Sequence, residues 1–427
     1  KTMAKPKLAL IPAAQGDKLY SVLPSSGVGD FDFSRSGGAT RINSQGLIET
    51  VADGVSRLNY SLIDGVVNGC PSHLLEPSRT NLVTYNNDLT NANWTTGNIS
   101  KVSNDTISPN GTLDASKVIA TVNNNSHYFQ QQFNIGENNV TISAYVKNID
   151  ANYIQVTNAG NALAFTNFDI QNGTVGTSGS AMSNQKIEKL PNDWYRISVT
   201  VDNTGVAITY MRFYMVTSAS AVFNEFWLPT SAVSLNVWGV QCELGEFETS
   251  VIPTTTSATT RSAETATNSG DASTFNDSEG VLMAEIDVVA DSTEKWISIS
   301  DGSVTNRIIL YISSSNTLRT FIGASGTQVD MNEVVNLDSY NKIAFKYKQN
   351  DFALWVNGFE IETDVNGNTP SNLSVLNLSS SNGLLNPFYG NTKQIQYFDS
   401  ALNDSDLETL TSWVSFSDMA NGQLYTI

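Results

Sequence analysis

The residues that most often perform catalysis or bind metals are scarce in this chain of 427 residues. Its only histidines are His73 and His127, so a histidine-built metal site or a Ser–His catalytic pair is not expected. Any histidine-dependent mechanism would have to use one of these two. The only cysteines, Cys70 and Cys242, match neither a disulfide framework nor a zinc spacing. A single long-range bridge between them is left open, but two separate thiols are favoured.

Aromatic side chains offer a different chemistry, because their flat faces can stack on the apolar faces of pyranose rings while planar polar groups bind the hydroxyls. Six aromatic residues are candidates for such contacts: Trp94, Tyr128, Tyr153, Tyr214, Trp296 and Tyr311. The competing interpretation is strong for each, since aromatic residues on strands mostly belong to the core. Trp194 and Trp355 lie inside the strongest strand patterns and are predicted to be core residues.

The charge distribution narrows the range of partners. The formal net charge is −18, and residues 1–80 hold eight Lys/Arg and seven Asp/Glu. The rest of the chain therefore has a balance of −19. Such an acidic surface repels nucleic acid and anionic lipid, so neither is an expected partner. It suits neutral glycans or other proteins.

The elements that must position these residues are strands. Between Leu82 and about Thr254, β-branched and apolar runs such as Val140–Val146 and Trp194–Val201 are separated by short Asn, Gly and Asp turns. No stretch of helical period is long enough for a crossover, so the sheets should be antiparallel. A second series of strands starts at Val281. The sequence predicts an all-β fold with two antiparallel β-sandwiches.

Composition divides the chain into four parts: an extended N-terminal β segment (1–82), a first sandwich (83–254), a linker (255–277) and a second sandwich (278–427). The linker is rich in Thr, Ser and Ala and cannot bury enough surface to fold alone, so we expect it to lie along one domain for part of its length. No apolar run approaches the roughly 20 residues of a membrane-spanning helix, so no membrane insertion is expected.

Two patterns lie in the N-terminal segment. Phe31 and Phe33 alternate with polar residues, which is the period of a half-buried strand. The stretch Asn43–Glu49 is typical of a hairpin leading into another short strand. The segment contains too little apolar material for a large core of its own. We expect it to be stabilised by packing on a partner chain or on the next domain.

Two further patterns lie in the second sandwich. Asn357–Gly358 is a strong two-residue hairpin signal between two apolar runs. The stretch Leu402–Leu410 predicts one short helix, which Asn403 or Ser405 can cap. Its two leucines at positions 407 and 410 would share one face.

A proline interrupts the stretch Leu74–Leu82, which joins the N-terminal segment to the first sandwich. Pro77 has no backbone N–H to donate, and it biases Glu76 toward an extended conformation. Glu76 and Arg79 bracket this proline and are predicted to be structural ties without a catalytic role.

Several of these motifs, in this order, resemble tail or fibre proteins of tailed phages and prophages. The leader of that family resembles Phe31–Asn43, Gly46–Glu49, Arg57–Leu58 and Leu74–Leu82. The carbohydrate-binding-like jelly roll that follows it is similar to Asn93–Trp94, Phe168–Ile170, Gly173–Val175, Trp194–Arg196, Trp238–Gly245 and Ser250–Ala263. A laminin-G-like or concanavalin-A-like domain is similar to Leu354–Gly358, Ile395–Phe398 and Ala401–Leu402 with the short helix.

The resemblance implies a virion protein of a tailed phage. Its expected function is adhesion to host-surface glycans as a tail fibre or other receptor-binding component. The N-terminal segment would attach it to other virion proteins, and a homo-oligomer, with a trimer favoured, would let weak sugar sites gain avidity. One alternative is a capsid, neck or tail decoration protein without sugar binding, and a second is a polysaccharide depolymerase.

The depolymerase alternative requires a pair of carboxyl groups. Retaining glycosidases place two of them about 5 Å apart, and the laminarinase-like branch of this fold has them in a Glu-x-Asp-x-Glu pattern or its bulged form. Glu285 and Asp287 match the start, but Val289 or Ala290 stands where the second glutamate should be. The sequence therefore predicts no enzyme.

No cofactor is expected, although a structural calcium is left open. Asp364–Asn368 is similar to part of a calcium loop, but it lacks the bidentate glutamate that ends such a loop, so a plain turn is favoured. Laminin-G-like domains often hold calcium through other loops.

Replacing Arg79 with Ala should loosen the junction at Leu74–Leu82 and leave glycan binding unchanged, because Arg79 is predicted to be a structural tie. Limited proteolysis would measure the loosening, and a glycan-binding assay would measure the affinity. Lost binding in a variant that still folds would contradict this role.

Overall fold

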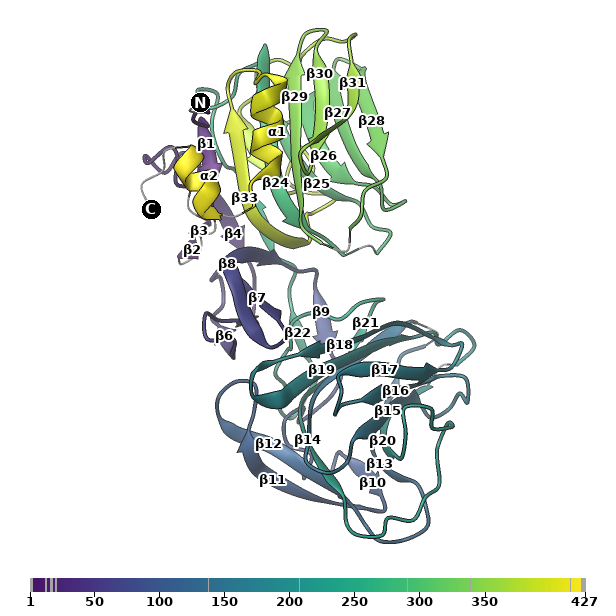
Figure 1. The fold of residues 1–427 in the computed structure, drawn as a ribbon. Coiled ribbons are helices and arrows are strands. Elements are labelled where there is room, and N and C mark those ends of the chain that lie inside the picture. The colour runs from purple at the N-terminus through teal and green to yellow at the C-terminus, as the bar shows by residue number, and fades with distance from the viewer. Residues whose placement is uncertain are drawn as a thin grey trace.

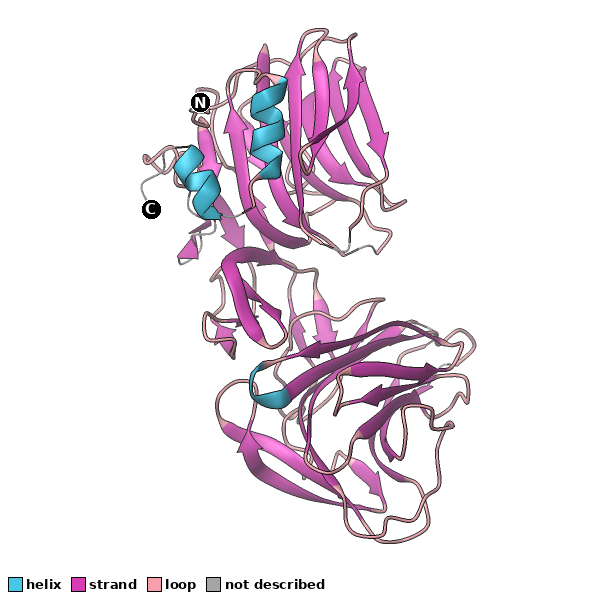
Figure 2. Ribbon diagram, viewed as in Figure 1, coloured by secondary structure: helices cyan, strands magenta, loops and turns pink. Residues whose placement is uncertain are grey.

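The structure is a computed structural model that describes residues 3–11, 14–15, 18–19, 21–136, 138–206, 208–289, 291–337, 339–414 and 416–423. It contains two β-sandwiches, with the N-terminal strands beside the second and between the two (Figures 1 and 2). The sheets are antiparallel, so the expected all-β fold with two antiparallel sandwiches is confirmed. No helix within the described ranges is long and apolar enough to cross a membrane.

The first sandwich consists of two six-stranded sheets. In order across one sheet lie β10 (Thr95–Gly97), β13 (His127–Asn134), β20 (Ile208–Val216), β15 (Tyr153–Asn158), β16 (Phe165–Asp169) and β17 (Thr174–Ser178). In order across the other lie β11 (Ile99–Ile107), β12 (Leu113–Ala120), β21 (Ser234–Leu244), β14 (Val140–Asn148), β19 (Trp194–Val201) and β18 (Met182–Lys189). Apolar residues of both sheets form one core, in which the rings of Phe129 and Phe213 stack with centroids 5.0 Å apart.

The second sandwich has one eight-stranded and one five-stranded sheet. The larger sheet contains β31 (Phe359–Asp364), β30 (Phe352–Val356), β29 (Asn341–Lys348), β24 (Glu279–Asp287), β33 (Gly390–Phe398), β8 (Val66–Leu75) and β7 (Leu58–Ile63), with β1 (Leu8–Leu10) also paired to β33. The smaller contains β28 (Thr327–Glu333), β27 (Leu318–Ala324), β26 (Asn306–Ile312), β25 (Lys295–Ser300) and β32 (Val375–Asn377). The predicted turn at Asn357–Gly358 joins β30 to β31, and both residues have the positive φ that a tight hairpin requires.

The predicted short helix is α1 (Asp404–Ser412). Asn403 is its N-cap, and its side-chain oxygen accepts a backbone hydrogen bond from the first turn. Leu407 and Leu410 are buried against the outer side of the larger sheet, as their shared face predicts. A second helix, α2 (Phe416–Gly422), was not predicted from the sequence.

The N-terminal segment is stabilised by strands from elsewhere in the chain, as its small apolar content predicts. β8 and β1 both pair with β33 of the second sandwich. β4 (Phe31–Ser34) buries both phenylalanines and exposes the two polar residues. The predicted hairpin is formed by β5 (Ala39–Ile42) and β6 (Ile48–Val51). The short strands β2 (Ala14–Gln15) and β3 (Lys18–Leu19) extend the sheet of β4.

Residues 255–277 are anchored by two strand pairs. β22 (Thr259–Arg261) pairs with β9 (Arg79–Asn81), which lies immediately before the first sandwich. β23 (Thr265–Thr267) pairs with β4. The chain therefore enters and leaves the first sandwich through adjacent antiparallel strands. The boundaries of the four parts remain predictions from the sequence.

A buried cluster of charged residues lies at this junction. Glu264 accepts hydrogen bonds from Arg35 Nη1 at 2.8 Å and from Arg57 Nε at 2.8 Å. Glu76 Oε2 lies 2.8 Å from both Arg57 Nη2 and Arg261 Nη1. The backbone N–H of Glu76 donates to Glu264 Oε2 at 2.8 Å. These contacts join residues up to 229 positions apart. The side chains of Arg35, Arg57, Arg261 and Glu264 are fully enclosed.

The predicted roles of Glu76 and Arg79 as structural ties fit their contacts. Ser250, on the segment that leaves the first sandwich, donates two hydrogen bonds to the Glu76 carboxylate. The Arg79 guanidinium lies over the ring of Phe247, 4.8 Å from its centroid, and 4.0 Å from Glu243. Both residues thus connect the start of the first sandwich to its end.

Replacing Glu264 with Gln should lower the free energy of unfolding by about 3–5 kcal/mol, because it leaves Arg35 buried without its countercharge and leaves Arg57 and Arg261 to share Glu76. Thermal or denaturant unfolding would measure this loss. Glu279→Gln is the matched control, since its pair with Lys348 is exposed and should be worth about 1 kcal/mol or less. Equal destabilisation by the two substitutions would contradict the importance of the cluster.

Acid should weaken the junction through Glu76. Burial opposes ionisation of this carboxyl, but Arg261, Arg57 and Ser250 outweigh burial and lower its pKa from 4.5 to about 2. Its contribution is therefore fully present above pH 4.5 and is lost as the pH falls toward 2. Between pH 6 and pH 2, the free energy of unfolding should fall less in Glu76→Gln than in the parent chain. Identical pH slopes for the two proteins would refute this prediction.

Candidate functional site

Trp94 is a core residue, contrary to its expected contact with sugar. Its side chain is 2% exposed, its ring packs edge-on against Phe129, and its indole N–H donates to the backbone oxygen of Tyr85 at 3.0 Å. No ring face is left for a ligand. Trp194 and Trp355 are also buried, as predicted.

Tyr128 and Tyr214 come together on the outer side of the sheet that contains β13 and β20. They are directly opposite in the strand register, and their ring centroids are 5.5 Å apart. Arg212 lies over the Tyr128 ring at 4.1 Å from its centroid, donates to the Tyr214 hydroxyl at 2.6 Å and to Gln130 Oε1 at 2.5 Å. We call these four residues the arginine–tyrosine face. Within this face Tyr214 is buried, whereas Tyr128, Arg212 and Gln130 are half-buried.

Tyr153 packs against the same buried cluster from β15. Beyond it, the outer side of the sheet is closed by the loop after β20. Gln155 accepts a hydrogen bond from the backbone N–H of Asn224, and Asn167 donates to the backbone oxygen of Ala221 at 2.8 Å. The loop therefore covers the β15 and β16 part of this outer side.

Trp296 and Tyr311 also come together, on the outer side of the five-stranded sheet in the second sandwich. They are opposite each other on β25 and β26, with ring centroids 5.3 Å apart. Arg307 lies over the Trp296 ring at 5.7 Å and over the Phe321 ring at 5.1 Å. Arg319 lies over Tyr311 at 5.5 Å. We call these five residues the tryptophan face.

Polar contacts hold the tryptophan face in place. The indole N–H of Trp296 donates to Glu294 at 3.1 Å, and Arg319 donates to both oxygens of Asp330 at 2.5 Å. Trp296 and both arginines are half-buried, whereas Tyr311 is 7% exposed and supports them from below. The face thus combines a partly open indole ring with fixed guanidinium and carboxylate groups. Such groups can stack on a pyranose ring and hydrogen-bond its hydroxyls.

The remaining reactive side chains, apart from Cys70, are occupied or enclosed. Glu285 accepts from Gln394 at 2.8 Å and lies 3.5 Å from Lys342. Burial lowers the pKa of His73 to about 3, so this histidine is neutral. Cys70 is exposed and Cys242 is buried, and both are free, which confirms two separate thiols. Among the described residues, no three His, Cys, Asp or Glu side chains gather closely enough to hold a metal ion.

The sequence reasoning missed the arginines of both faces. Arg212 stands two positions before Tyr214, and Arg307 stands four positions before Tyr311, so each shares a strand face with a candidate aromatic residue. This even spacing along a strand is the feature of the sequence that could have identified the two arginines. The partner strand that completes each cluster could not be identified without the pairing.

Comparison with known proteins agrees with the expected concanavalin-A-like domain. Residues 284–408 match the family model of the concanavalin A-like lectin/glucanases superfamily. None of the curated proteins compared with the chain matches it. The matched residues include the tryptophan face.

Solved structures show only a distant likeness. A carbohydrate-binding module (CBM40) of the Ruminococcus gnavus IT-sialidase, bound to α2,3-sialyllactose, is 16% identical, with a TM-score of 0.30 over 34% of this chain and 92% of the module. Domain 4 of an extracellular arabinanase from Geobacillus stearothermophilus, in complex with arabinotriose, is 13% identical, with a TM-score of 0.30 over 39% of this chain and 82% of that domain. At these scores the likeness carries no argument about ligand. The similarity of the C-terminal part to the concanavalin A-like superfamily rests on the match of residues 284–408 to the family model.

Proposed function

We propose that this chain binds glycans through the tryptophan face, with the arginine–tyrosine face as a second contact surface. The observation that carries the proposal is the Trp296–Tyr311 pair, with Arg307 over the indole ring and Arg319 over the tyrosine ring. The pair lies on a sheet of the part that matches the concanavalin A-like lectin/glucanases superfamily. α1 covers the outer side of the opposite sheet, so it does not cover this face (Figure 1). The acidic charge of the chain favours neutral over anionic glycans.

We further propose that the protein is a virion component of a tailed phage, either a tail fibre or another receptor-binding protein, and that its ligand is a host-surface polysaccharide. This part rests on the resemblance of the N-terminal leader and the jelly-roll motifs. Display as a homotrimer would let weak sites act together through avidity. The N-terminal segment would contact other virion proteins.

A role without catalysis is part of the proposal. Glu285 is engaged by Gln394 and Lys342, and Val289 stands where one form of the catalytic pattern needs a glutamate. The other form would need the glutamate at residue 290, where the sequence has alanine. Release of reducing ends from host polysaccharide by the purified chain would instead establish the depolymerase alternative.

Replacing Trp296 with Ala should weaken binding to host-surface polysaccharide about tenfold, because it removes the ring on which a sugar would stack. A glycan array followed by calorimetry on the best ligand would measure the affinity. Phe359→Ala is the matched control, since Phe359 is 71% exposed on β31, in the other sheet, and should bind as the parent chain does.

Two outcomes would overturn the proposal. One is a parent chain that binds no glycan, which would favour the decoration protein, above all if electron microscopy located the chain on the capsid shell and away from the fibres. The other is an equal affinity of Trp296→Ala and the parent chain, which would remove the tryptophan face from the binding site.

A further inference from the structure

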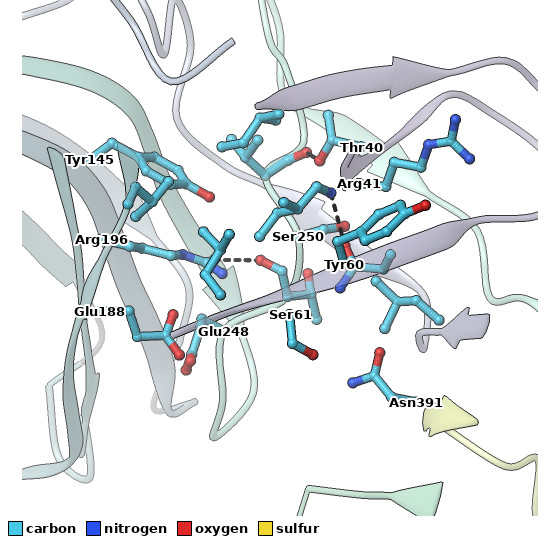
Figure 3. A pocket seen from close by; sticks show the side chains of 18 of the residues that line it. Thr40, Arg41, Tyr60, Ser61, Tyr145, Glu188, Arg196, Glu248, Ser250 and Asn391 are labelled. Atoms are coloured by element: carbon cyan, nitrogen blue, oxygen red, sulfur yellow. Dashed lines mark hydrogen bonds between the residues drawn. The ribbon is translucent and has the colours of Figure 1, made fainter. Parts of the chain in front are cut away.

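A cavity of about 490 Å³ lies between the N-terminal segment and the first sandwich (Figure 3). One wall has Tyr145, Arg196, Glu188 and Glu248, which come from β14, β19, β18 and the segment after β21. The opposite wall includes Thr40, Arg41 and Tyr60 of β5 and β7, and Asn391 of β33 lies at its edge. Its volume falls in the range of small-molecule sites, roughly 300–1,000 Å³.

Arg196 supplies a half-buried guanidinium to the sandwich wall of this cavity. Its Nη2 donates to the backbone oxygen of Thr249 at 2.5 Å, and the guanidinium lies over the Tyr145 ring at 5.5 Å from the centroid. Its Nε has no hydrogen-bond partner although it is buried. Burial disfavours the charge of Arg196, but Tyr145 and three nearby glutamates outweigh burial and raise its pKa, so the guanidinium stays charged.

The carboxylates beside Arg196 are only partly satisfied. Glu248 Oε1 lies 3.1 Å from Lys186 Nζ, whereas Oε2 is buried and has no partner. Glu188 is exposed on the same wall. Buried polar atoms without partners are uncommon in folded proteins and call for an explanation such as a bound polar molecule.

The charges that line the cavity nearly cancel. Arg41 is paired with Glu49, Glu76 with Arg57 and Arg261, and Glu248 with Lys186. The lining charges that remain are Asp64, Glu188, Lys189 and Arg196. Because two of these side chains are positive and two are negative, the cavity favours neither anions nor cations. The four side chains still supply both hydrogen-bond donors and acceptors. Tyr60 and Tyr145 add aromatic rings to the same space.

We propose that this cavity is a further ligand site, separate from both sheet faces, which takes one or two units of a neutral, hydroxyl-rich saccharide. Arg196 and Asn391 would donate hydrogen bonds, and Glu188 and Glu248 would accept them from hydroxyls. The half-buried ring of Tyr60 would contact the apolar ring face, with the buried Tyr145 as support behind Arg196. The inference shares its ligand class with the proposed glycan binding, but its residues belong to neither sheet face.

A bound saccharide would also bridge two parts of the chain. Thr40, Arg41 and Tyr60 belong to the N-terminal segment, whereas Arg196 and Glu188 belong to the first sandwich. Ser250 lines the cavity and donates to Glu76 of the buried charged cluster. Occupancy should therefore stabilise the junction and raise the melting temperature of the full chain.

The test uses the full chain, calorimetry, and a panel of neutral disaccharides with glucuronate and sialyllactose as charged comparisons. Glu188→Gln and Tyr60→Ala should each weaken binding of a neutral disaccharide at least fivefold. Glu188 is exposed, so its isosteric replacement should leave the fold intact. Phe359→Ala is again the control.

Trp296→Ala separates the two sites. Neutral-disaccharide binding that survives Trp296→Ala and is lost in the double variant with Glu188→Gln supports the cavity. Binding abolished by Trp296→Ala alone, with Glu188→Gln and Tyr60→Ala unchanged, overturns the cavity and leaves the proposed function standing. Selective binding of the charged sugars at the cavity, or no binding by any variant or the parent chain, also overturns it.

Discussion

The pairing of Glu264 and Glu76 with three buried arginines is the constraint on which the arrangement of this protein depends. Removing five charged groups from water costs several kcal/mol for each, and only close, multiple hydrogen bonds offset that cost. The required geometry exists only when β4, β8, β9, β22 and β23 meet at one place. We infer that the cluster selects this arrangement more than it adds stability, since an apolar replacement of equal shape could be as stable.

This junction determines where the cavity lies. Because β9 and β22 are neighbours, the first sandwich is inserted as a unit into a chain whose N-terminal strands complete the second sandwich. The cavity follows from the same geometry, since the hairpin of β5 and β6 lies over the outer side of the sheet that contains β14. The hairpin, through Ile48, and the segment that follows β21, through Gly245 and Val251, together cover this side, so β14 is buried on both faces from Val140 to Val146.

The two sheet faces show how strand register separates core residues from the outward-facing residues proposed to bind glycans. Phe129 and Tyr128 are adjacent on β13, yet one is buried in the core and the other lies outside with Arg212. The same alternation on β25 buries Ile297 and turns Trp296 outward. Trp94 lies before β10, where no such alternation applies, and it fills the core.

The sequence by itself determined the local structure: the all-β class, the Asn357–Gly358 hairpin and the capped helix α1. These follow from short-range preferences in turns, caps and alternation, which need no distant partner. Only the tertiary structure decided which aromatic residues face outward, where Arg212 and Arg307 lie, and that Glu264 meets Arg35 across 229 positions. Strand pairing and burial of charge are long-range, and many registers satisfy the same alternating pattern until the whole chain is packed.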